Sequence, residues 1–128
     1  MVSAAGLLIS VEALAIGQRY GLDPGTMVDV LNASTGMNNS TQNKLKPFVL
    51  SRSFDSGFTL ELMSKDLGIA LSIAHDVRAA APFSAQCEQL WAGALRLLED
   101  GADHTEIARL VEKMNGLELG RNASRRHS

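Results

Sequence analysis

An almost wholly apolar run near the N-terminus is the feature that most constrains the fold of this chain. Residues 2–16 read VSAAGLLISVEALAI and contain one charged side chain, Glu12. The Ala13-Leu14-Ala15 triplet resembles a signal-peptidase site, but no Lys or Arg precedes the run and Glu12 lies inside it. The run is also shorter than the roughly 20 residues of a membrane span. We therefore predict a long helix that is buried nearly all round by neighbours, and no membrane association.

The way this run begins is unusual for a helix. No Ser, Thr, Asp or Asn stands ahead of it in the N-cap position, although Ser3 offers a late cap. We therefore expect that the chain starts inside a helix and is a fragment of a longer protein. A long helix that is apolar on all sides also needs more cover than a small domain supplies, which predicts a homodimer or a higher homo-oligomer.

Length and charge exclude several classes of protein. With 128 residues the chain has room for one domain, and 12 basic against 14 acidic residues give a net charge of −2. No basic face that would bind nucleic acid is visible in the sequence. The single cysteine, Cys87, forms neither an internal disulfide nor a cysteine-based zinc site. These features predict a cytoplasmic protein with no metal and no nucleic-acid partner.

Capping and turn signals predict an all-α domain of six helices with no strand. Gly21 ends the first helix, and Asp23 with Pro24 begins the second. The other expected helices span about 44–50, 59–78, 85–99 and 103–116, with Ser84 capping the fifth and Asp103 the sixth. The helical domain is thus expected to cover residues 1–116. Residues 117–128 are polar and basic and are expected to be a disordered tail.

Few residues carry chemistry that is visible in isolation. The chain contains neither a G-x-G-x-x-G nor a G-x-x-x-x-G-K-[ST] motif. Cys87, in the middle of a helix, is interpreted as a packed thiol. His75 and His104 lack the partners of a metal site and are interpreted as surface or capping residues.

The fourth expected helix contains the candidate site residues. Asp66 falls between Leu62 and Ile69 in an apolar stripe, where a buried carboxylate is costly unless it is paired. Lys65 shares its face with Gly68, and a glycine inside a helix costs up to about 1 kcal/mol relative to alanine. One interpretation is that the glycine lets a ligand approach the lysine. The alternative, which spacing alone favours, is an exposed ion pair between Lys65 and Glu61.

Several motifs together resemble a known family. They are Glu12-Ala-Leu-Ala, Gly21-Leu-Asp-Pro24, Asn32-Ala-Ser-Thr-Gly36 and Gly57-Phe58-x-x-x-Leu62-x-x-Lys65-Asp66-Leu67-x-x-Ala70. In this order they are similar to the C-terminal helical domain of β-hydroxyacid dehydrogenases, the 3-hydroxyisobutyrate and 6-phosphogluconate dehydrogenase-like enzymes. The resemblance covers residues 1 to about 115. The Asn-Asn-Ser-Thr segment at 38–41 and the Leu-Met-x-Lys-Asp-Leu segment are most similar to the 3-hydroxyisobutyrate dehydrogenase branch.

The resemblance implies a two-domain enzyme of which this chain is the second part. In the family an N-terminal Rossmann domain binds NAD or NADP, and the helical domain closes the active-site cleft and makes subunit contacts. The enzyme transfers a hydride between the cofactor and a small β-hydroxyacid. The family's general acid/base lysine lies in a G-x-x-x-K-x-x-N motif that would precede Met1. The resemblance therefore implies an active dehydrogenase as the parent protein, no catalytic residue in this chain, and no activity of the chain alone.

Three residues are matched to the family's site by this resemblance. Lys65 corresponds to a lysine that lies over cofactor and substrate, where a cation stabilises negative charge. Asp66 corresponds to its acidic neighbour and Phe58 to an aromatic residue that lines the pocket. The remaining alternative is a free-standing helical interaction module that keeps the fold without the chemistry.

Overall fold

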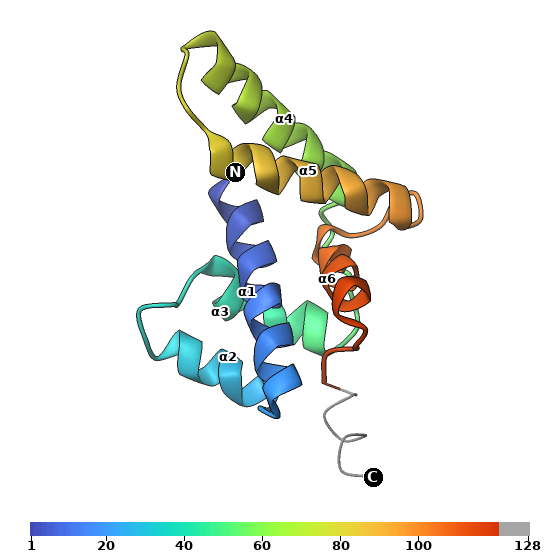
Figure 1. Cartoon of the computed structure of the whole chain (residues 1–128). Coiled ribbons are helices and arrows are strands. Elements are labelled where there is room, and N and C mark those ends of the chain that lie inside the picture. The colour runs from blue at the N-terminus through green and yellow to red at the C-terminus, as the bar shows by residue number, and fades with distance from the viewer. Residues whose placement is uncertain (121–128) are drawn as a thin grey trace.

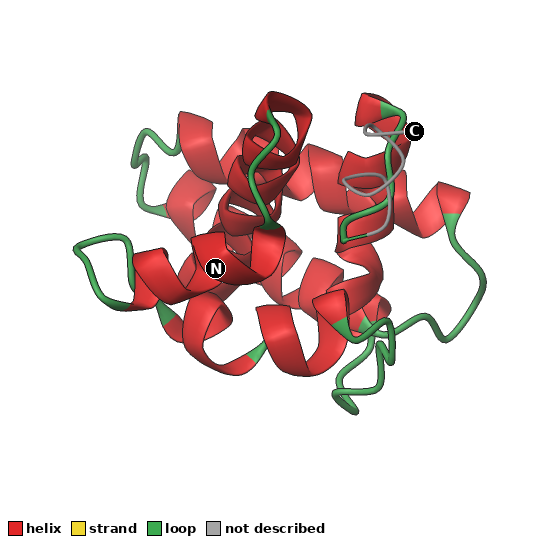
Figure 2. Cartoon of the chain, turned by 90° about the horizontal axis from the view of Figure 1, so that it is seen from below, coloured by secondary structure: helices red, strands yellow, loops and turns green. Residues whose placement is uncertain are grey.

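The computed structural model describes residues 1–120 and is helical throughout that range, as the sequence predicts (Figures 1 and 2). Its elements in chain order are α1 (Val2–Tyr20), α2 (Pro24–Asn32), α3 (Asn39–Asn43), a π-helical turn η1 (Leu45–Leu50), α4 (Leu60–Asp76), α5 (Pro82–Leu97), a 3₁₀ turn η2 (His104–Glu106) and α6 (Ile107–Asn115). No strand occurs among the described residues, where a single β-bridge pairs Thr59 with Asp103.

The predicted local signals fix most of the helix ends. Gly21 ends α1 in the left-handed conformation, with φ of 107°. The Asp23 carboxylate accepts a hydrogen bond from the Thr26 amide at 2.9 Å at the start of α2. Asp103 and Glu106 form the expected capping box, although the turn that they open is 3₁₀ before α6 begins.

Two boundaries differ from the prediction. The expected third helix is divided, because Asn38 caps the short α3 and Pro47 lies in the separate π-helical turn. The α5 helix begins at Pro82, so Ser84 is not its cap. A proline is well suited to the first helical turn, where its missing amide proton has no intrahelical acceptor, and the Ala85 amide bonds to the Ala81 carbonyl at 3.0 Å.

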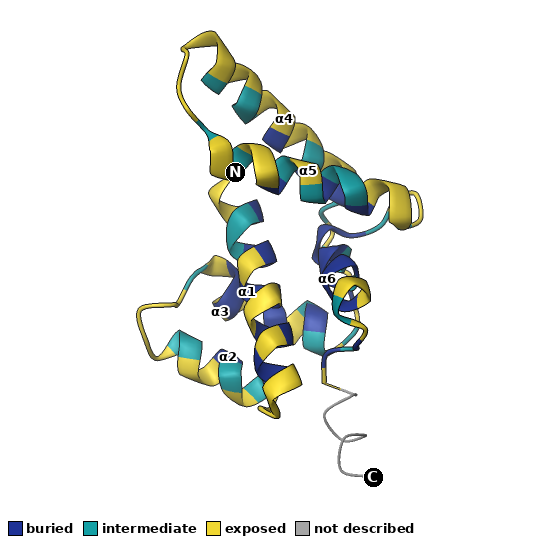
Figure 3. Cartoon of the chain, in the orientation of Figure 1, coloured by how far each residue is buried: buried dark blue, intermediate teal, exposed yellow. Residues whose placement is uncertain are grey.

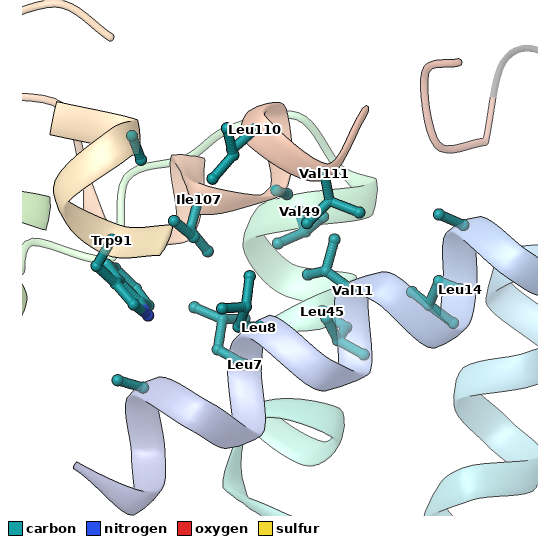
Figure 4. Close-up of a cluster of buried hydrophobic side chains, with 14 of the residues drawn as sticks. Leu7, Leu8, Val11, Leu14, Leu45, Val49, Trp91, Ile107, Leu110 and Val111 are labelled. Atoms are coloured by element: carbon teal, nitrogen blue, oxygen red, sulfur yellow. The ribbon is translucent and has the colours of Figure 1, made fainter. Parts of the chain in front are cut away.

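The core is assembled along one side of α1 (Figure 4). Leu7, Val11 and Leu14 have no exposed surface, and Leu7 and Val11 lie among side chains from η1, α5 and α6. The other side of α1 is uncovered within this chain, where Ile9 and Ile16 are 55% and 64% exposed (Figure 3). The small helices of this chain therefore cover only one side of α1, and burial of its other side requires a neighbour from outside the described residues.

The length of α1 differs from that of the apolar run from which membrane association was excluded. The helix is 19 residues long, and by length and composition alone it is apolar enough to cross a bilayer. The length argument made from residues 2–16 thus does not hold for the whole helix. The share of the apolar window that is buried inside the fold is 44%, and a packed helix of this kind passes the same composition test as a membrane span.

α4 and α5 form a hairpin that extends away from α2 and α3 (Figure 1). The stripe of α4 that contains Leu60, Met63 and Leu67 is buried against the rest of the chain. The second stripe is not covered, since Leu62, Ile69 and Ile73 are all about half exposed (47%, 52% and 58%). Within the described residues, α4 is therefore covered along one stripe only. The outer face of α4 is open, as the exposed colour along the helix shows (Figure 3), and it carries these apolar residues beside charged ones.

The chain after α6 folds back onto the core instead of leaving it at residue 117. Gly116 turns the backbone with φ of 63°, and the Leu119 side chain is buried to 1% exposure. The Leu119 amide donates to the Glu112 carboxylate at 2.8 Å, and the Gly120 amide donates to the Gln18 side chain at 2.7 Å. Residues 117–120 are therefore part of the domain. The rest of the expected tail, 121–128, lies outside the described residues.

Candidate functional site

The loop before α4, which carries Phe58, is tied to the turn before α6. The Gly57 amide donates to the Asp103 carboxylate at 3.0 Å, and the His104 amide donates to the Phe58 carbonyl at 2.7 Å. Gly57 adopts φ of 93°, a conformation that side-chain-bearing residues rarely adopt. These bonds hold Phe58 in place, half-buried against the core.

Asp103 is the centre of this connection. Its carboxylate accepts hydrogen bonds from the Ser56 hydroxyl at 2.9 Å, from the amides of Gly57 and Thr105 at 3.0 Å, and from the Thr105 hydroxyl. Burial raises the pKa of the Asp103 carboxyl group, but the hydrogen bonds from Thr105, Ser56 and Gly57 outweigh burial and hold its pKa below the usual range. Asp103 is therefore ionised, and its carboxylate oxygens accept hydrogen bonds that hold the two loops together.

His104 is buried, with 3% of its surface exposed, and not the surface residue that the sequence indicates. Its Nδ1 lies 3.0 Å from the Phe58 carbonyl oxygen, and a hydrogen bond between these two atoms requires a proton on Nδ1. The His104 ring also contacts the Phe58 ring edge-to-face, with centroids 5.5 Å apart. Burial and the positive charge of Lys44 lower the pKa of the imidazole, against the opposing effects of Phe58 and Asp103. His104 is thus neutral at pH 7, and its buried Nε2 has no hydrogen-bond partner among the described residues.

Lys65 and Asp66 both lie on the exposed side of α4. The ion pair between Lys65 and Glu61 does not form, since no acidic group of the described residues lies within 4 Å of the ammonium. Asp66 is exposed, so the buried carboxylate expected from its position between apolar residues is also absent. A Cβ added to Gly68 would meet nothing within 4 Å in this chain, so packing inside the chain does not require the glycine.

The structure brings only some of the predicted site residues together. Lys65 and Asp66 lie side by side on α4, and Phe58 lies just before the same helix. Phe58, however, is engaged with His104, and no hydrogen bond or ion pair links its loop to Lys65 or Asp66 within the described residues. Lys65 and Asp66 therefore lie on an open part of α4, and Phe58 is held separately by its contact with His104.

A further cation, Lys44, was not singled out from the sequence. It lies between α3 and η1 and is half-buried, and its Nζ donates to the Ser3 hydroxyl at 3.2 Å. Burial lowers the pKa of its ammonium group, and the negative charge of Asp103 offsets part of this effect. The sequence signal was limited to the polar segment 38–43 before it, because the contact with Ser3 spans 41 residues.

Neither Cys87 nor the other residues of metal-binding type form a reactive or metal-binding site among the described residues. Cys87 is 6% exposed on α5, and burial raises the pKa of its thiol, which agrees with a packed side chain and not with a nucleophile. Among residues 1–120, no three His, Cys, Asp or Glu side chains are grouped so that they could hold a metal ion.

Comparison with known proteins identifies the family of this helical domain. Residues 1–111 match the family described as "NAD-binding of NADP-dependent 3-hydroxyisobutyrate dehydrogenase". The chain belongs to this NAD(P)-binding family, which confirms the resemblance found in the sequence.

Individual relatives agree with this assignment. The chain is 30% identical over 108 residues to 2-(hydroxymethyl)glutarate dehydrogenase of Eubacterium barkeri, with 84% of this chain and 36% of the relative covered. It is 36% identical over 86 residues to 3-hydroxyisobutyrate dehydrogenase of Pseudomonas aeruginosa, with 62% and 29% covered. The fold is similar to that of Mycobacterium tuberculosis 3-hydroxyisobutyrate dehydrogenase, solved with L-serine, at a TM-score of 0.72 and 25% identity, with 89% and 40% covered. The chain thus spans about a third of the length of the curated relatives that it matches.

Proposed function

We propose that this chain is the helical domain that completes the active site of an NAD(P)-dependent oxidoreductase acting on a small β-hydroxyacid, similar to 3-hydroxyisobutyrate. It is the six-helix type of domain found at the C-terminus of 6-phosphogluconate dehydrogenase-like enzymes, and it has no activity by itself. The observation that carries the proposal is the state of Lys65, an exposed cation with no ion-pair partner among the described residues, one helical turn from Gly68.

The surroundings of Lys65 fit an anionic ligand that comes from outside the chain. A glycine at an exposed position inside a helix costs up to about 1 kcal/mol relative to alanine. Nothing in the described chain occupies the space beside Gly68, so no packing contact within this domain offsets the loss of helix stability that the glycine causes. A ligand or a second domain that approaches α4 closely at this point would require the glycine, because a side chain there would be in its way. The Lys65 ammonium then contacts the ligand's negative charge.

The residues of the site take distinct roles in this proposal. The bound cofactor accepts or supplies the hydride. Lys65 binds a carboxylate or phosphate oxygen by a charge-assisted hydrogen bond. Asp66, exposed next to it, orients the lysine or contacts the ligand, and Phe58 covers one wall of the pocket and excludes water. The open apolar face formed by Leu62, Ile69 and Ile73 is covered by the nucleotide-binding domain when the cleft closes.

A fusion protein tests the proposal. The segment of the P. aeruginosa relative that precedes its matched region is joined to Met1 of this chain, and reduction of NAD+ or NADP+ by 3-hydroxyisobutyrate is followed at 340 nm. The account predicts activity of the fusion, and none from the isolated chain or the isolated segment. Cofactor binding by the fusion, measured by fluorescence, shows that the added segment is folded. A fusion that binds cofactor and leaves every small β-hydroxyacid unoxidised would favour the free-standing interaction module instead.

Oligomerisation is the second part of the proposed role. A groove of about 370 Å³ runs between α1, α5 and α6, and it is lined by Leu8, Ile9, Phe83, Leu90 and Met114 among others. Phe83 is 83% exposed at the edge of this groove, and Ile9 and Ile16 continue the apolar surface along α1. Exposed apolar surface of this extent is typical of subunit interfaces. We therefore propose that a second copy of the chain covers the open side of α1.

A further inference from the structure

Lys44 is held in a defined position by the segment that precedes it. Asn38 caps α3 and donates from Nδ2 to the Ser10 hydroxyl of α1 at 3.2 Å. Asn32 donates to the Thr41 carbonyl at 2.9 Å, which fixes the other side of α3. This short polar segment is therefore fastened across α1, and it places Lys44 beside Ser3 at the beginning of that helix.

The backbone at Lys44 is equally constrained. Its carbonyl accepts hydrogen bonds from the amides of both Phe48 at 3.0 Å and Val49 at 3.3 Å, where the chain enters the π-helical turn. π-Helical turns are rare in proteins, and they are frequent at functional sites. The lysine side chain thus leaves from a rigid point and not from a mobile loop.

The charge of Lys44 is not neutralised by its neighbours. Ser3, which accepts its hydrogen bond, is uncharged, and His104 is neutral at pH 7. Asp103 is the nearby anion, but its two oxygens are already used by four donor groups from Ser56, Gly57 and Thr105. No carboxylate of residues 1–120 lies within ion-pair distance of the Lys44 ammonium. Partial burial of an unpaired ammonium is costly, and an anionic ligand group would remove that cost.

We propose that Lys44 and Ser3 form a carboxylate-binding subsite that holds the acid group of the substrate, an inference that rests on the proposed function. One ammonium and one hydroxyl match the two oxygens of a single carboxylate. A phosphate carries up to two charges and three free oxygens, and Asp103 nearby opposes the second charge. The π-helical turn that follows Lys44 contacts the 3₁₀ turn that contains His104, and the His104 ring packs against Phe58, so Lys44 and Phe58 approach the same turn.

The subsite is tested first by binding to the full chain. Side-chain NMR signals of Lys44, and the backbone amide signals of Ser3 and Leu45 that every variant retains, are followed during titration with 3-hydroxypropionate, with 1,3-propanediol, which lacks the acid group, and with inorganic phosphate. We expect a saturable shift with the hydroxyacid, no shift with the diol, and weaker binding of phosphate. Lys44→Met weakens carboxylate binding by about tenfold or more. Lys46→Met is the matched control, because Lys46 is exposed and paired with Asp29, and it leaves binding unchanged.

Three results would overturn the subsite. They are the absence of a saturable shift at Lys44, tighter binding of phosphate than of the carboxylate, and an equal loss of binding in Lys46→Met. Thermal unfolding of Lys44→Met checks that the variant folds, and we expect its midpoint to be equal to or above that of the wild type because an unpaired, partly buried charge is removed.

Kinetics of the fusion enzyme separate this inference from the proposed function. Lys44→Met raises the KM for the hydroxyacid by about tenfold or more and leaves the KM for the cofactor unchanged. If the fusion is inactive while Lys44 still binds the carboxylate, the proposed function fails and the subsite stands. If the fusion is active and Lys44→Met has wild-type kinetics, the subsite fails and the proposed function stands.

Discussion

Phe58 and His104, 46 residues apart in the chain, are joined both through the backbone and through their rings. The imidazole Nδ1 donates to the Phe58 carbonyl oxygen at 3.0 Å, and the two rings meet edge-to-face at 5.5 Å between centroids. The His104 amide donates to the same carbonyl at 2.7 Å. This connection fixes the loop before α4 to the turn before α6, and it requires a proton on Nδ1, while burial lowers the pKa of the imidazole and favours the neutral ring.

The burial of His104 predicts acid sensitivity of the fold. Its pKa in the folded chain is below the ordinary value of 6.5, so the unfolded chain takes up the proton first as the pH falls below 6.5. Stability is therefore lost in that direction, by at most about 1.4 kcal/mol per pH unit for one group. Urea unfolding between pH 7.5 and 5.5 measures the loss. We expect His104→Gln to reduce it and His75→Gln, at an exposed site, to retain it. Equal acid sensitivity of both variants would contradict this role of His104.

Gly68 is predicted to lower the unfolding free energy of the domain and to leave space for a ligand beside Lys65. Because a Cβ at this position meets nothing within 4 Å, Gly68→Ala should raise the unfolding free energy of the isolated chain by up to about 1 kcal/mol. In the fusion enzyme the same change should lower kcat/KM by about tenfold, since a methyl group then intrudes beside Lys65. Gly93→Ala, a glycine on α5 with equally open surroundings, is the control and should change stability alone. Full activity of Gly68→Ala would show that nothing approaches this position.

The ion pair between Arg52 and Glu112 is predicted to hold the C-terminal segment. Both side chains are mostly buried, at 16% and 7% exposure, and Glu112 also accepts the Leu119 amide. Glu112→Gln leaves the mostly buried guanidinium with the longer contact to Glu118 at 3.5 Å and should cost about 2–4 kcal/mol in chemical unfolding. Asp29→Asn breaks the exposed pair with Lys46 and should cost less than about 1 kcal/mol. Similar losses in the two variants would show that burial does not strengthen the pair.

The open side of α1 predicts the oligomeric state. Sedimentation at micromolar concentration should show a dimer or larger assembly for the wild-type chain. Ile9→Glu places a second carboxylate, in addition to Glu12, in the largely apolar groove and should give a folded monomer. Val30→Glu, at a similarly exposed position on α2, should leave the assembly intact. A monomeric wild-type chain would remove the proposed interface.

Local features of the fold were predictable because each depends on residues close in sequence. The caps at Gly21, Asp23 and Asp103 involve partners within four residues. The apolar stripe of Leu62, Ile69 and Ile73 shows the limit of that reasoning. Spacing reveals that such a face is apolar, but not whether this chain or another domain covers it. The same limit applies to α1, whose apolar pattern does not reveal that the helices of this chain cover one side of it only.

The candidate site was predictable in part. Lys65, Asp66 and Phe58 were found through their resemblance to a family, and their proposed roles still await the experiments above. His104 was interpreted as a surface or capping residue and Lys44 was not singled out, because their contacts with Phe58 and Ser3 span 46 and 41 residues and no local pattern encodes them. A histidine that follows a capping aspartate is a weak signal on its own, since the same position is often exposed.

The central claim is that Lys65 binds a charged group of cofactor or substrate, and the kinetics of Lys65→Ala in the fusion enzyme test it most directly. Loss of one charge-assisted contact in a closed site should lower kcat/KM by about 10²–10³-fold. Lys46→Ala serves as the control for loss of a surface cation, and far-ultraviolet circular dichroism confirms that both variants fold. The account predicts the large loss for Lys65→Ala alone; a value within about twofold of the wild type would contradict it.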